Sequence, residues 1–265
     1  MTAVSDVLAK AKADGRAALI GYLPVGYPSV AVSIDAMRAM VAAGVDIVEV
    51  GVPYSDPVMD GPTIQAATEQ AVRAGVSLRD ALAAVQAVVD AGAAAVTMGY
   101  WNQIERYGVD RFATDLAAAG GSGAITPDLI PEEAAEWIAA SDRTGLDRVF
   151  LVAPSSTDAR VVSTAAASRG FVYATAVMGV TGAREAVGDA AATLVGRVRS
   201  LAPQIPVCVG LGVSSGAQAA QVAAFADGVI VGSALVKRLL DSPDAAGVAA
   251  VGELSAELAE GVRRR

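Results

Sequence analysis

The amino-acid sequence contains no histidine and a single cysteine, Cys208, among its 265 residues. Without an imidazole, the chain cannot form a catalytic triad with a histidine base, a histidine-ligated zinc site or an imidazole acid or base. Any proton transfer must therefore use carboxylates, lysine, tyrosine or water. One cysteine excludes an intramolecular disulfide and suits a reducing compartment, and in its apolar run we expect it to pack as a small core residue.

Charge is also scarce, at 18% of residues, and unbalanced, because 20 Lys and Arg oppose 28 Asp and Glu for a formal net charge of -8. Such a chain repels phosphodiester backbones, so we expect no nucleic-acid binding. Two long uncharged stretches, 17–34 and 201–226, are interrupted by proline and glycine, and the charged N-terminal residues lack the apolar core of a signal peptide. We expect a cytoplasmic protein without a membrane segment.

Short β-branched runs closed by Gly or Pro alternate along the chain with Ala-rich stretches that have apolar residues at helical spacing. The eight candidate strands cover residues 18–23, 46–51, 94–99, 123–126, 148–153, 171–176, 206–210 and 227–231. Apolar strands joined by helical crossovers are typical of a parallel sheet. Eight such units, with no break in composition, predict an α/β fold: a (β/α)8 TIM barrel with extra helices, in which residues 1–265 form a single domain.

An open, doubly wound sheet is the structural alternative to a barrel. Its first strand is usually followed by a G-x-G-x-x-G turn, and residues 22–28 read YLPVGYP instead. Two helical stretches, one before the first strand and one at 77–91, exceed the minimal barrel but do not form a second domain.

Glu49 is the first candidate for chemistry, because it lies in the strand DIVEVG with Ile47 and Gly51 on the same face. A carboxylate in a buried strand is unfavourable unless it is paired or used. In a barrel, catalytic groups gather at the carboxyl ends of the strands, which favours a site role for Glu49. The alternative is a salt bridge to a lysine or arginine inside the barrel.

The segment GVPYSDPVMDGPTIQ, residues 51–65, follows that strand and carries two further carboxylates, Asp56 and Asp60. Three prolines and two glycines predict a tightly constrained loop. An aspartate before Pro or Gly often forms an Asx turn, and Asp60 also stands where it could cap the helix that starts at Gly61-Pro62. Both structural roles therefore compete with a catalytic one.

The last three strands end in glycine-rich segments, GVTG at 179–182, GLGVSSG at 210–216 and VGSAL at 231–235. Glycine lets backbone N–H groups approach an anion, and a helix that starts after Gly232-Ser233 adds the positive end of its dipole. Loops at this position in barrels often bind phosphate. Although glycine also ends strands for conformational reasons, three such segments favour a phosphate-bearing substrate.

The motif VEVGVPYSDPVMDGPTIQ, residues 48–65, resembles the signature of tryptophan synthase alpha chains, E-x-G-x-P-F-S-D-P-x-A-D-G-P-x-I-Q. The segments GYLPVGYPS, MGYWNQIERYG, PDLIPEEA, FLVAPSST and GVTGAR also resemble the family, in the same order, so the resemblance spans nearly the whole chain. The departures are mild: Tyr54 replaces the common Phe, Met59 a small residue, Trp101 a Tyr and Gln103 a Pro.

The resemblance implies a cofactor-free lyase that splits indole-3-glycerol phosphate into indole and glyceraldehyde 3-phosphate by a retro-aldol reaction. Two carboxylates can divide the proton transfers that this cleavage needs. By resemblance, Glu49 is the acid and base at indole C3 and the adjacent hydroxyl, and Asp60 faces the indole N–H. The remaining positions carried over from the family are Gly182, Gly212, Gly232 and Ser233 for the phosphate, Thr181 as a link to Asp60, and Tyr22, Tyr100 and Tyr173 around the substrate.

The resemblance also implies a partner, the pyridoxal-phosphate-dependent beta chain, with two alpha chains flanking a beta dimer. The loop 53–60, the segment around Asn102 and Tyr107, and the turn 127–131 are the expected contacts. We further expect residues 179–188 to form a lid, because they combine three glycines with phosphate-facing N–H groups.

Two other functions compete with this one. The chain could be a different phosphate-binding barrel enzyme, although the SDPVMDGP motif argues against it. It could also be a catalytically silent subunit that modulates a partner, which the presence of both Glu49 and Asp60 disfavours.

Overall fold

The computed structural model describes residues 3–175 and 184–264, with the side chains of 184–187 excepted. Within these residues, one parallel sheet runs in the order β5-β4-β3-β2-β1-β9-β8-β7-β6. Its strands are β1 (Ala18–Pro24), β2 (Ile47–Gly51), β3 (Ala94–Met98), β4 (Gly123–Ile125), β5 (Asp147–Val149), β6 (Leu151–Val152), β7 (Val172–Thr175), β8 (Val207–Gly210) and β9 (Gly228–Val231).

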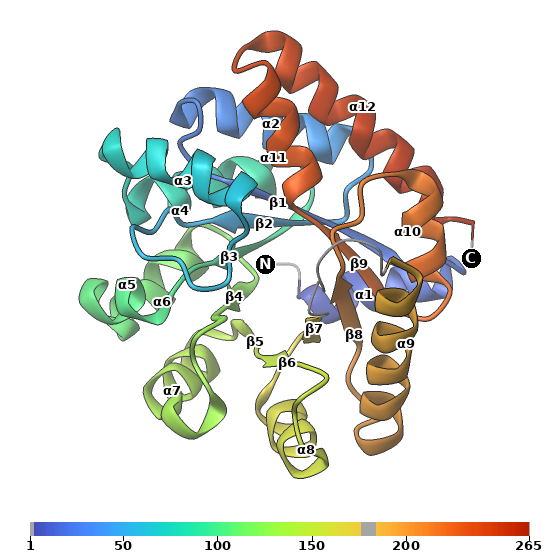
Figure 1. Ribbon diagram of the computed structural model, residues 1–265. Coiled ribbons are helices and arrows are strands. Elements are labelled where there is room, and N and C mark those ends of the chain that lie inside the picture. The colour runs from blue at the N-terminus through green and yellow to red at the C-terminus, as the bar shows by residue number, and fades with distance from the viewer. Residues whose placement is uncertain (1–2, 176–183, 265) are drawn as a thin grey trace.

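The two outermost strands, β5 and β6, are halves of one predicted strand, because only Phe150 separates them along the chain. β5 pairs with β4 and β6 pairs with β7, so this short break joins the two ends of the sheet. The N–H of Tyr173 donates to the Phe150 carbonyl at 3.1 Å, which starts the ladder to β7 at the break itself. The sheet is therefore a barrel (Figure 1), and the predicted fold class is confirmed.

The helices that surround this barrel are α1 (Val4–Ala13), α2 (Val30–Ala42), α3 (Pro62–Arg73), α4 (Leu78–Asp90), α5 (Trp101–Tyr107), α6 (Val109–Ala118), α7 (Ala135–Thr144), α8 (Asp158–Ala167), α9 (Arg184–Leu201), α10 (Gly216–Ala223), α11 (Ser233–Asp241) and α12 (Ala245–Val262). Helices α3 and α11 begin where the sequence predicts, after Gly61 and Gly232. Ser29 caps α2 by accepting from the Val32 N–H, and Ser77 with Asp80 forms a capping box on α4. The two extra helices expected are α1 and α4.

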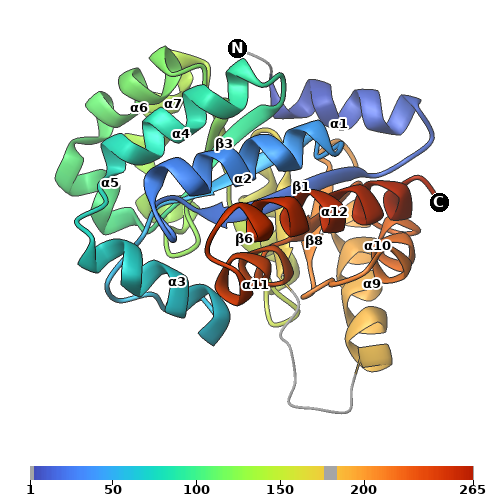
Figure 2. The same ribbon diagram turned by 90° about the horizontal axis from the view of Figure 1, so that it is seen from above.

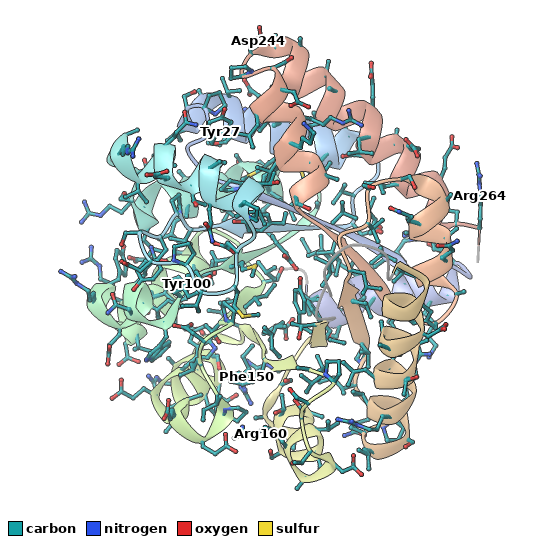
Figure 3. The ribbon with its side chains drawn as sticks, in the orientation of Figure 1. Tyr27, Tyr100, Phe150, Arg160, Asp244 and Arg264 are labelled. Atoms are coloured by element: carbon teal, nitrogen blue, oxygen red, sulfur yellow. The ribbon has the colours of Figure 1, made fainter. Side chains whose placement is uncertain are left out.

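Side chains of the strands alternate between the barrel interior and the layer beneath the helices. Ile47 belongs to an inner cluster with Ile20, Val96 and Cys208, whereas Val48 belongs to the outer cluster that the helices cover. The period-two assignment of β2 is therefore confirmed, and it turns Glu49 inward. At the periphery of the molecule, Arg160, Asp244 and Arg264 lie far from the barrel axis (Figure 3).

Helix α1 closes the amino-terminal end of the barrel, as Figure 2 shows from above. Val4, Leu8 and Ala11 are buried against the inner cluster, and the Val4 N–H donates to Asp147 Oδ2 at 2.9 Å. Because this end is plugged, access to the interior is left to the carboxyl ends of the strands. None of the helices in the part of the chain described is long and apolar enough to cross a membrane.

Candidate active site

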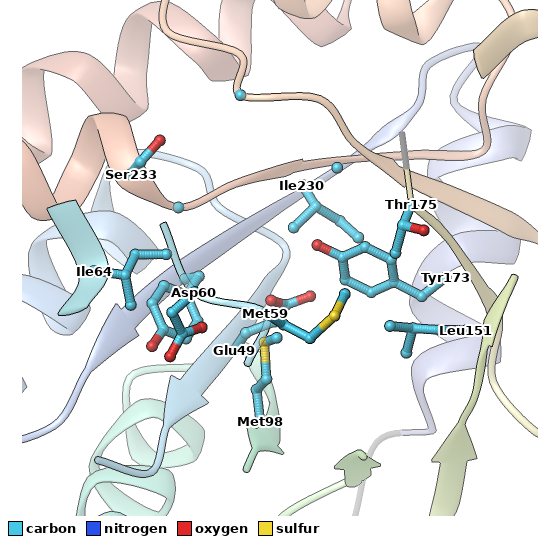
Figure 4. Close-up of a pocket in the computed structure, with 14 residues that line it drawn as sticks. Glu49, Met59, Asp60, Ile64, Met98, Leu151, Tyr173, Thr175, Ile230 and Ser233 are labelled. Atoms are coloured by element: carbon cyan, nitrogen blue, oxygen red, sulfur yellow. The ribbon is translucent and has the colours of Figure 1, made fainter. Parts of the chain in front are cut away.

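A cavity of about 220 Å³ opens at the carboxyl ends of the strands (Figure 4). It is lined by seven of the residues singled out from the sequence, Tyr22, Glu49, Asp60, Tyr173, Gly212, Gly232 and Ser233. The other lining residues are Met59, Ile64, Met98, Leu151, Thr175, Gly210 and Ile230. Residues from distant parts of the sequence therefore meet at the barrel mouth, where parallel α/β barrels carry their chemistry.

Glu49 lies on the cavity floor and is fully buried. Its strand β2 is paired on both sides, with Tyr22 of β1 and Val96 of β3 opposite Glu49. Neither carboxylate oxygen has a hydrogen-bond partner among the described residues, and no ion pair reaches Glu49 there. The described residues therefore give the salt-bridge alternative no support. Burial raises the pKa of Glu49 from 4.5 to about 8, which favours the protonated acid at neutral pH.

Asp60 lines the same cavity from the loop between β2 and α3, beside Ile64 (Figure 4). Helix α3 begins at Pro62 with Gly61 as its N-cap and no side-chain cap bond, so the capping role considered for Asp60 is wrong. Burial raises the pKa of Asp60 from 3.8 to about 6. At neutral pH the two carboxyl groups thus differ, with Glu49 protonated and Asp60 ionised.

The other aspartate of this loop, Asp56, lies elsewhere. Its exposed carboxylate accepts from the Ser55 hydroxyl at 2.5 Å, and it does not line the cavity with Asp60. Its contact is thus with a neighbouring side-chain hydroxyl and not with the cavity.

Two tyrosines face the cavity across glycines of the neighbouring strands. A Cβ at Gly51 would lie 2.5 Å from the Tyr22 hydroxyl oxygen, and a Cβ at Gly210 would lie 2.5 Å from that of Tyr173. Each ring therefore occupies the space that a missing side chain leaves. Tyr22 is buried and Tyr173 is partly buried, and desolvation raises the pKa of both well above the usual value, so both hydroxyls remain protonated.

Tyr100 differs from these two, because it does not line the cavity. Its ring stacks on Tyr54 with centroids 4.9 Å apart, and its hydroxyl accepts from the Met59 N–H at 3.0 Å. Tyr100 therefore holds the loop that carries Asp60.

The glycine-rich ends of β8 and β9 lie on the side of the cavity away from Leu151 (Figure 4). Gly212 has a φ of +66°, a left-handed conformation that glycine adopts without strain. Helix α11 begins at Ser233 with Gly232 as its N-cap, so its unpaired N–H groups and positive dipole end lie at the cavity. Thr181, Gly182 and the start of the expected lid, 179–183, lie outside the described residues.

Sequence reasoning missed half of the lining, and part of it was within reach. Met98, Leu151 and Ile230 are the last inward-facing residues of their strands, so extending the period-two pattern to each strand end would have identified them. Met59 and Ile64 enter from the loop and from α3, where no periodicity indicates direction. Within the described residues, no group of three potential metal ligands gathers here or elsewhere.

Comparison with known proteins adds a family to this geometry. A family model described as tryptophan synthase alpha chain matches residues 8–262. The curated tryptophan synthase alpha chain of Thermobifida fusca (strain YX) is 61% identical over 99% of this chain and 98% of its own. A structure of Mycobacterium tuberculosis tryptophan synthase superposes with a TM-score of 0.92, at 61% identity and 98% coverage of both chains. Tryptophan synthase subunit alpha from Legionella pneumophila str. Paris superposes at 0.90 with 30% identity, over 100% of each chain.

Proposed function

The chain belongs to the tryptophan synthase alpha chain family, a family of lyases that cleave indole-3-glycerol phosphate, and from this membership we propose how its own residues carry out the reaction. The alternative of an unrelated phosphate-binding barrel enzyme is wrong. One observation carries the proposed mechanism: two carboxyl groups face one cavity, Glu49 fully buried with no hydrogen-bond partner among the described residues and Asp60 partly buried. Desolvation raises their pKa values to different levels, about 8 and about 6.

Glu49 acts as both acid and base in the cleavage. Its protonated carboxyl gives a proton to indole C3, and the resulting carboxylate takes the proton of the hydroxyl on the adjacent side-chain carbon. The bond between C3 and that carbon then breaks, its electron pair returns to the indole ring, and the side chain leaves as the aldehyde. Glu49 ends protonated, as it began, so no external proton carrier is needed.

Asp60 stabilises the charge that this sequence creates. Protonation at C3 leaves the ring electron-poor, and the ionised carboxylate accepts a hydrogen bond from the indole N–H, where positive charge develops. A pKa of about 6 keeps Asp60 ionised at neutral pH while Glu49 remains protonated.

The glycine-rich ends of β8 and β9 bind the phosphate. Gly212, Gly232 and Ser233 present backbone N–H groups and the start of α11 to the anion. Tyr22 and Tyr173 flank the substrate, and Tyr100 supports the loop that carries Asp60 through Met59. For Gly182 as a further phosphate ligand and Thr181 as the link to Asp60, the support is the family resemblance alone.

We also propose that the chain acts as one domain in the cytoplasm, within a heterotetramer of two alpha chains and a beta dimer whose beta chains carry pyridoxal phosphate. Exposed apolar side chains at the mouth support such a contact: Val58 is 76% exposed, Met59 50% and Ile130 39%. Val58 and Met59 lie in the loop 53–60 and Ile130 in the turn 127–131, two of the segments expected to contact the partner. Indole is neutral and apolar, so direct transfer to a second enzyme would prevent its loss.

The proposed reaction is tested by adding indole-3-glycerol phosphate to the purified chain and measuring indole. Asp60→Asn should lower kcat by about 100-fold or more, because an amide cannot stabilise the charge on the ring nitrogen, with the melting temperature unchanged. Wild-type turnover with a lowered melting temperature would show a structural role instead. A catalytically silent subunit would release no indole in any variant.

The proposed partner is tested by mixing the chain with its cognate beta chain. Co-elution and a marked rise in indole-3-glycerol phosphate turnover are expected, because docking orders the loop that carries Asp60. No complex and no change in rate would refute the proposal.

A further inference from the structure

The loop that carries Asp60 is held near both of its ends by side chains from the start of α5. Near the beginning of the loop, Gln103 Nε2 donates to the Pro53 carbonyl at 2.7 Å. Near its end, the hydroxyl of Tyr100, the N-cap residue of α5, accepts from the Met59 N–H at 3.0 Å, one residue before Asp60. The helix and its cap residue thus hold the loop by two separate hydrogen bonds.

Helix α5 is itself anchored to the barrel. The Trp101 N–H, in its first turn, donates to both carboxylate oxygens of Asp128, at 2.9 and 3.1 Å. Asp128 follows β4, so the helix is tied to the loop of a different strand. A charge-assisted bond of this kind fixes the helix against which the Asp60 loop rests.

Gln103 has features that stability alone does not explain. Its Oε1 is buried and has no hydrogen-bond partner among the described residues, which is unfavourable for an amide oxygen. The side chain therefore buries an unpaired acceptor while it makes one directed bond to the loop.

We propose that Gln103 is a positioning residue for Asp60, acting through the Pro53 carbonyl, and that with Tyr100 it sets where the Asp60 carboxylate meets the indole N–H. Gln103 does not touch the substrate cavity, so it acts only through the loop. The inference rests on the proposed role of Asp60. It predicts an effect on turnover without a matching effect on stability.

The test uses Gln103→Met in the full-length chain, which keeps the length of the side chain and removes the donor. We expect kcat for indole release to fall about tenfold, since misplacing a positioned group by about 1 Å can cost up to about 100-fold. The dissociation constant of glycerol 3-phosphate should stay within about twofold, because Gly232 and Ser233 belong to the end of β9 and the start of α11, neither of which Gln103 bonds. The melting temperature should not fall, because the unpaired buried oxygen is also removed.

Gln86→Met is the matched control, because the Gln86 amide also makes one side-chain bond from a helix, to Asp90 at 2.9 Å, but on the exposed surface of α4. It should leave kcat unchanged. Gln103→Glu keeps the shape of the side chain, and as an ionised carboxylate it has no N–H to donate to the Pro53 carbonyl. It should show the same loss of kcat, which keeps the test valid if the methionine variant folds poorly.

A double-mutant cycle separates this inference from the proposed function. In an Asp60→Asn background, Gln103→Met should lower kcat by less than about twofold further, because its effect passes through Asp60. Full additivity of the two effects would overturn the positioning role while leaving Asp60 catalytic. If Gln103→Met kept the parental kcat while Asp60→Asn was inactive, the positioning role of Gln103 would also be overturned. If Asp60→Asn was active, the role of Asp60 itself would be refuted.

Discussion

The barrel holds two buried carboxyl groups at opposite ends, and their surroundings differ. Asp147, at the amino-terminal end, is 4% exposed; it accepts from the Val4 N–H at 2.9 Å and lies 3.6 Å from the Arg169 guanidinium. Glu49, near the carboxyl end, is fully buried and has no partner among the described residues. Burial raises the pKa of both, but the Val4 N–H and Arg169 oppose that rise only at Asp147.

The difference separates structure from chemistry within one barrel. Asp147 ties helix α1 to the end that it closes, so its hydrogen-bonding capacity is used by the fold. Glu49 keeps both oxygens free for a substrate, at the expense of an unpaired buried group. The stability of the fold does not require a carboxyl group at this position, since an apolar or amide side chain there would give a more stable folded state.

The largest expected effect is that of Glu49→Gln on turnover. The substitution removes the proton carrier and preserves volume, so kcat should fall by about 10² to 10⁴-fold. The glycerol 3-phosphate affinity and the circular dichroism spectrum should be unchanged, and the melting temperature should not fall. Indole release and thermal unfolding of the same preparation check this, and more than a tenth of the parental rate in a folded variant would make Glu49 structural.

Asp147→Ala should give the reverse pattern. It removes the buried acceptor of the Val4 N–H and the carboxylate that forms an ion pair with Arg169 at 3.6 Å, so the free energy of unfolding should fall by about 2 to 3 kcal/mol. Because helix α1 and Asp147 lie at the end of the barrel away from the cavity, kcat of the folded fraction should remain within about twofold. Urea unfolding and indole release measure the two effects. A variant that kept its stability and lost turnover would erase the distinction between the two ends.

The strand that carries Glu49 illustrates what the sequence alone could predict. Alternation along β2 predicted the inward direction of Glu49, and glycine and proline marked where β1 and β2 end, because these signals are local. The match to a long motif identified Asp60 as a site residue. Whether Glu49 was paired or free depended on contacts between distant strands, which no local pattern contains.

The roles of Tyr100 and Gln103 were out of reach for the same reason. Tyr100 was expected to line the indole pocket, yet its hydroxyl bonds the Met59 N–H 41 residues away, and Gln103 bonds Pro53 at a separation of 50. Similarly, the break at Phe150 depends on how the last strands meet to close the barrel. These features follow from tertiary packing of loops and helices.

A smaller expected effect is the contribution of Glu49 to the pH dependence of stability. The pKa of Glu49 rises from 4.5 to about 8 on folding, so the folded chain holds a proton that the unfolded chain releases between these values. The stabilisation is complete below pH 4.5 and is lost as the pH rises to 8, at up to about 1.4 kcal/mol per pH unit. Glu49→Gln should remove this slope. Urea unfolding at pH 5 to 9 tests it, and equal slopes in parent and variant would contradict the raised pKa.

The smallest effect on stability and turnover should come from Cys208→Ala, which probes the inner cluster between helix α1 and the cavity. Cys208 is fully buried in the inner cluster, opposite Tyr173 in the register of β7 and β8, but it does not line the cavity. Truncation should lower the free energy of unfolding by about 1 kcal/mol and leave kcat within about twofold. Burial also raises the pKa of its thiol, so the native chain should resist a thiol-reactive disulfide that modifies the urea-unfolded chain. A tenfold loss of turnover without a loss of stability would contradict this packing role and would show that Cys208 takes part in the reaction.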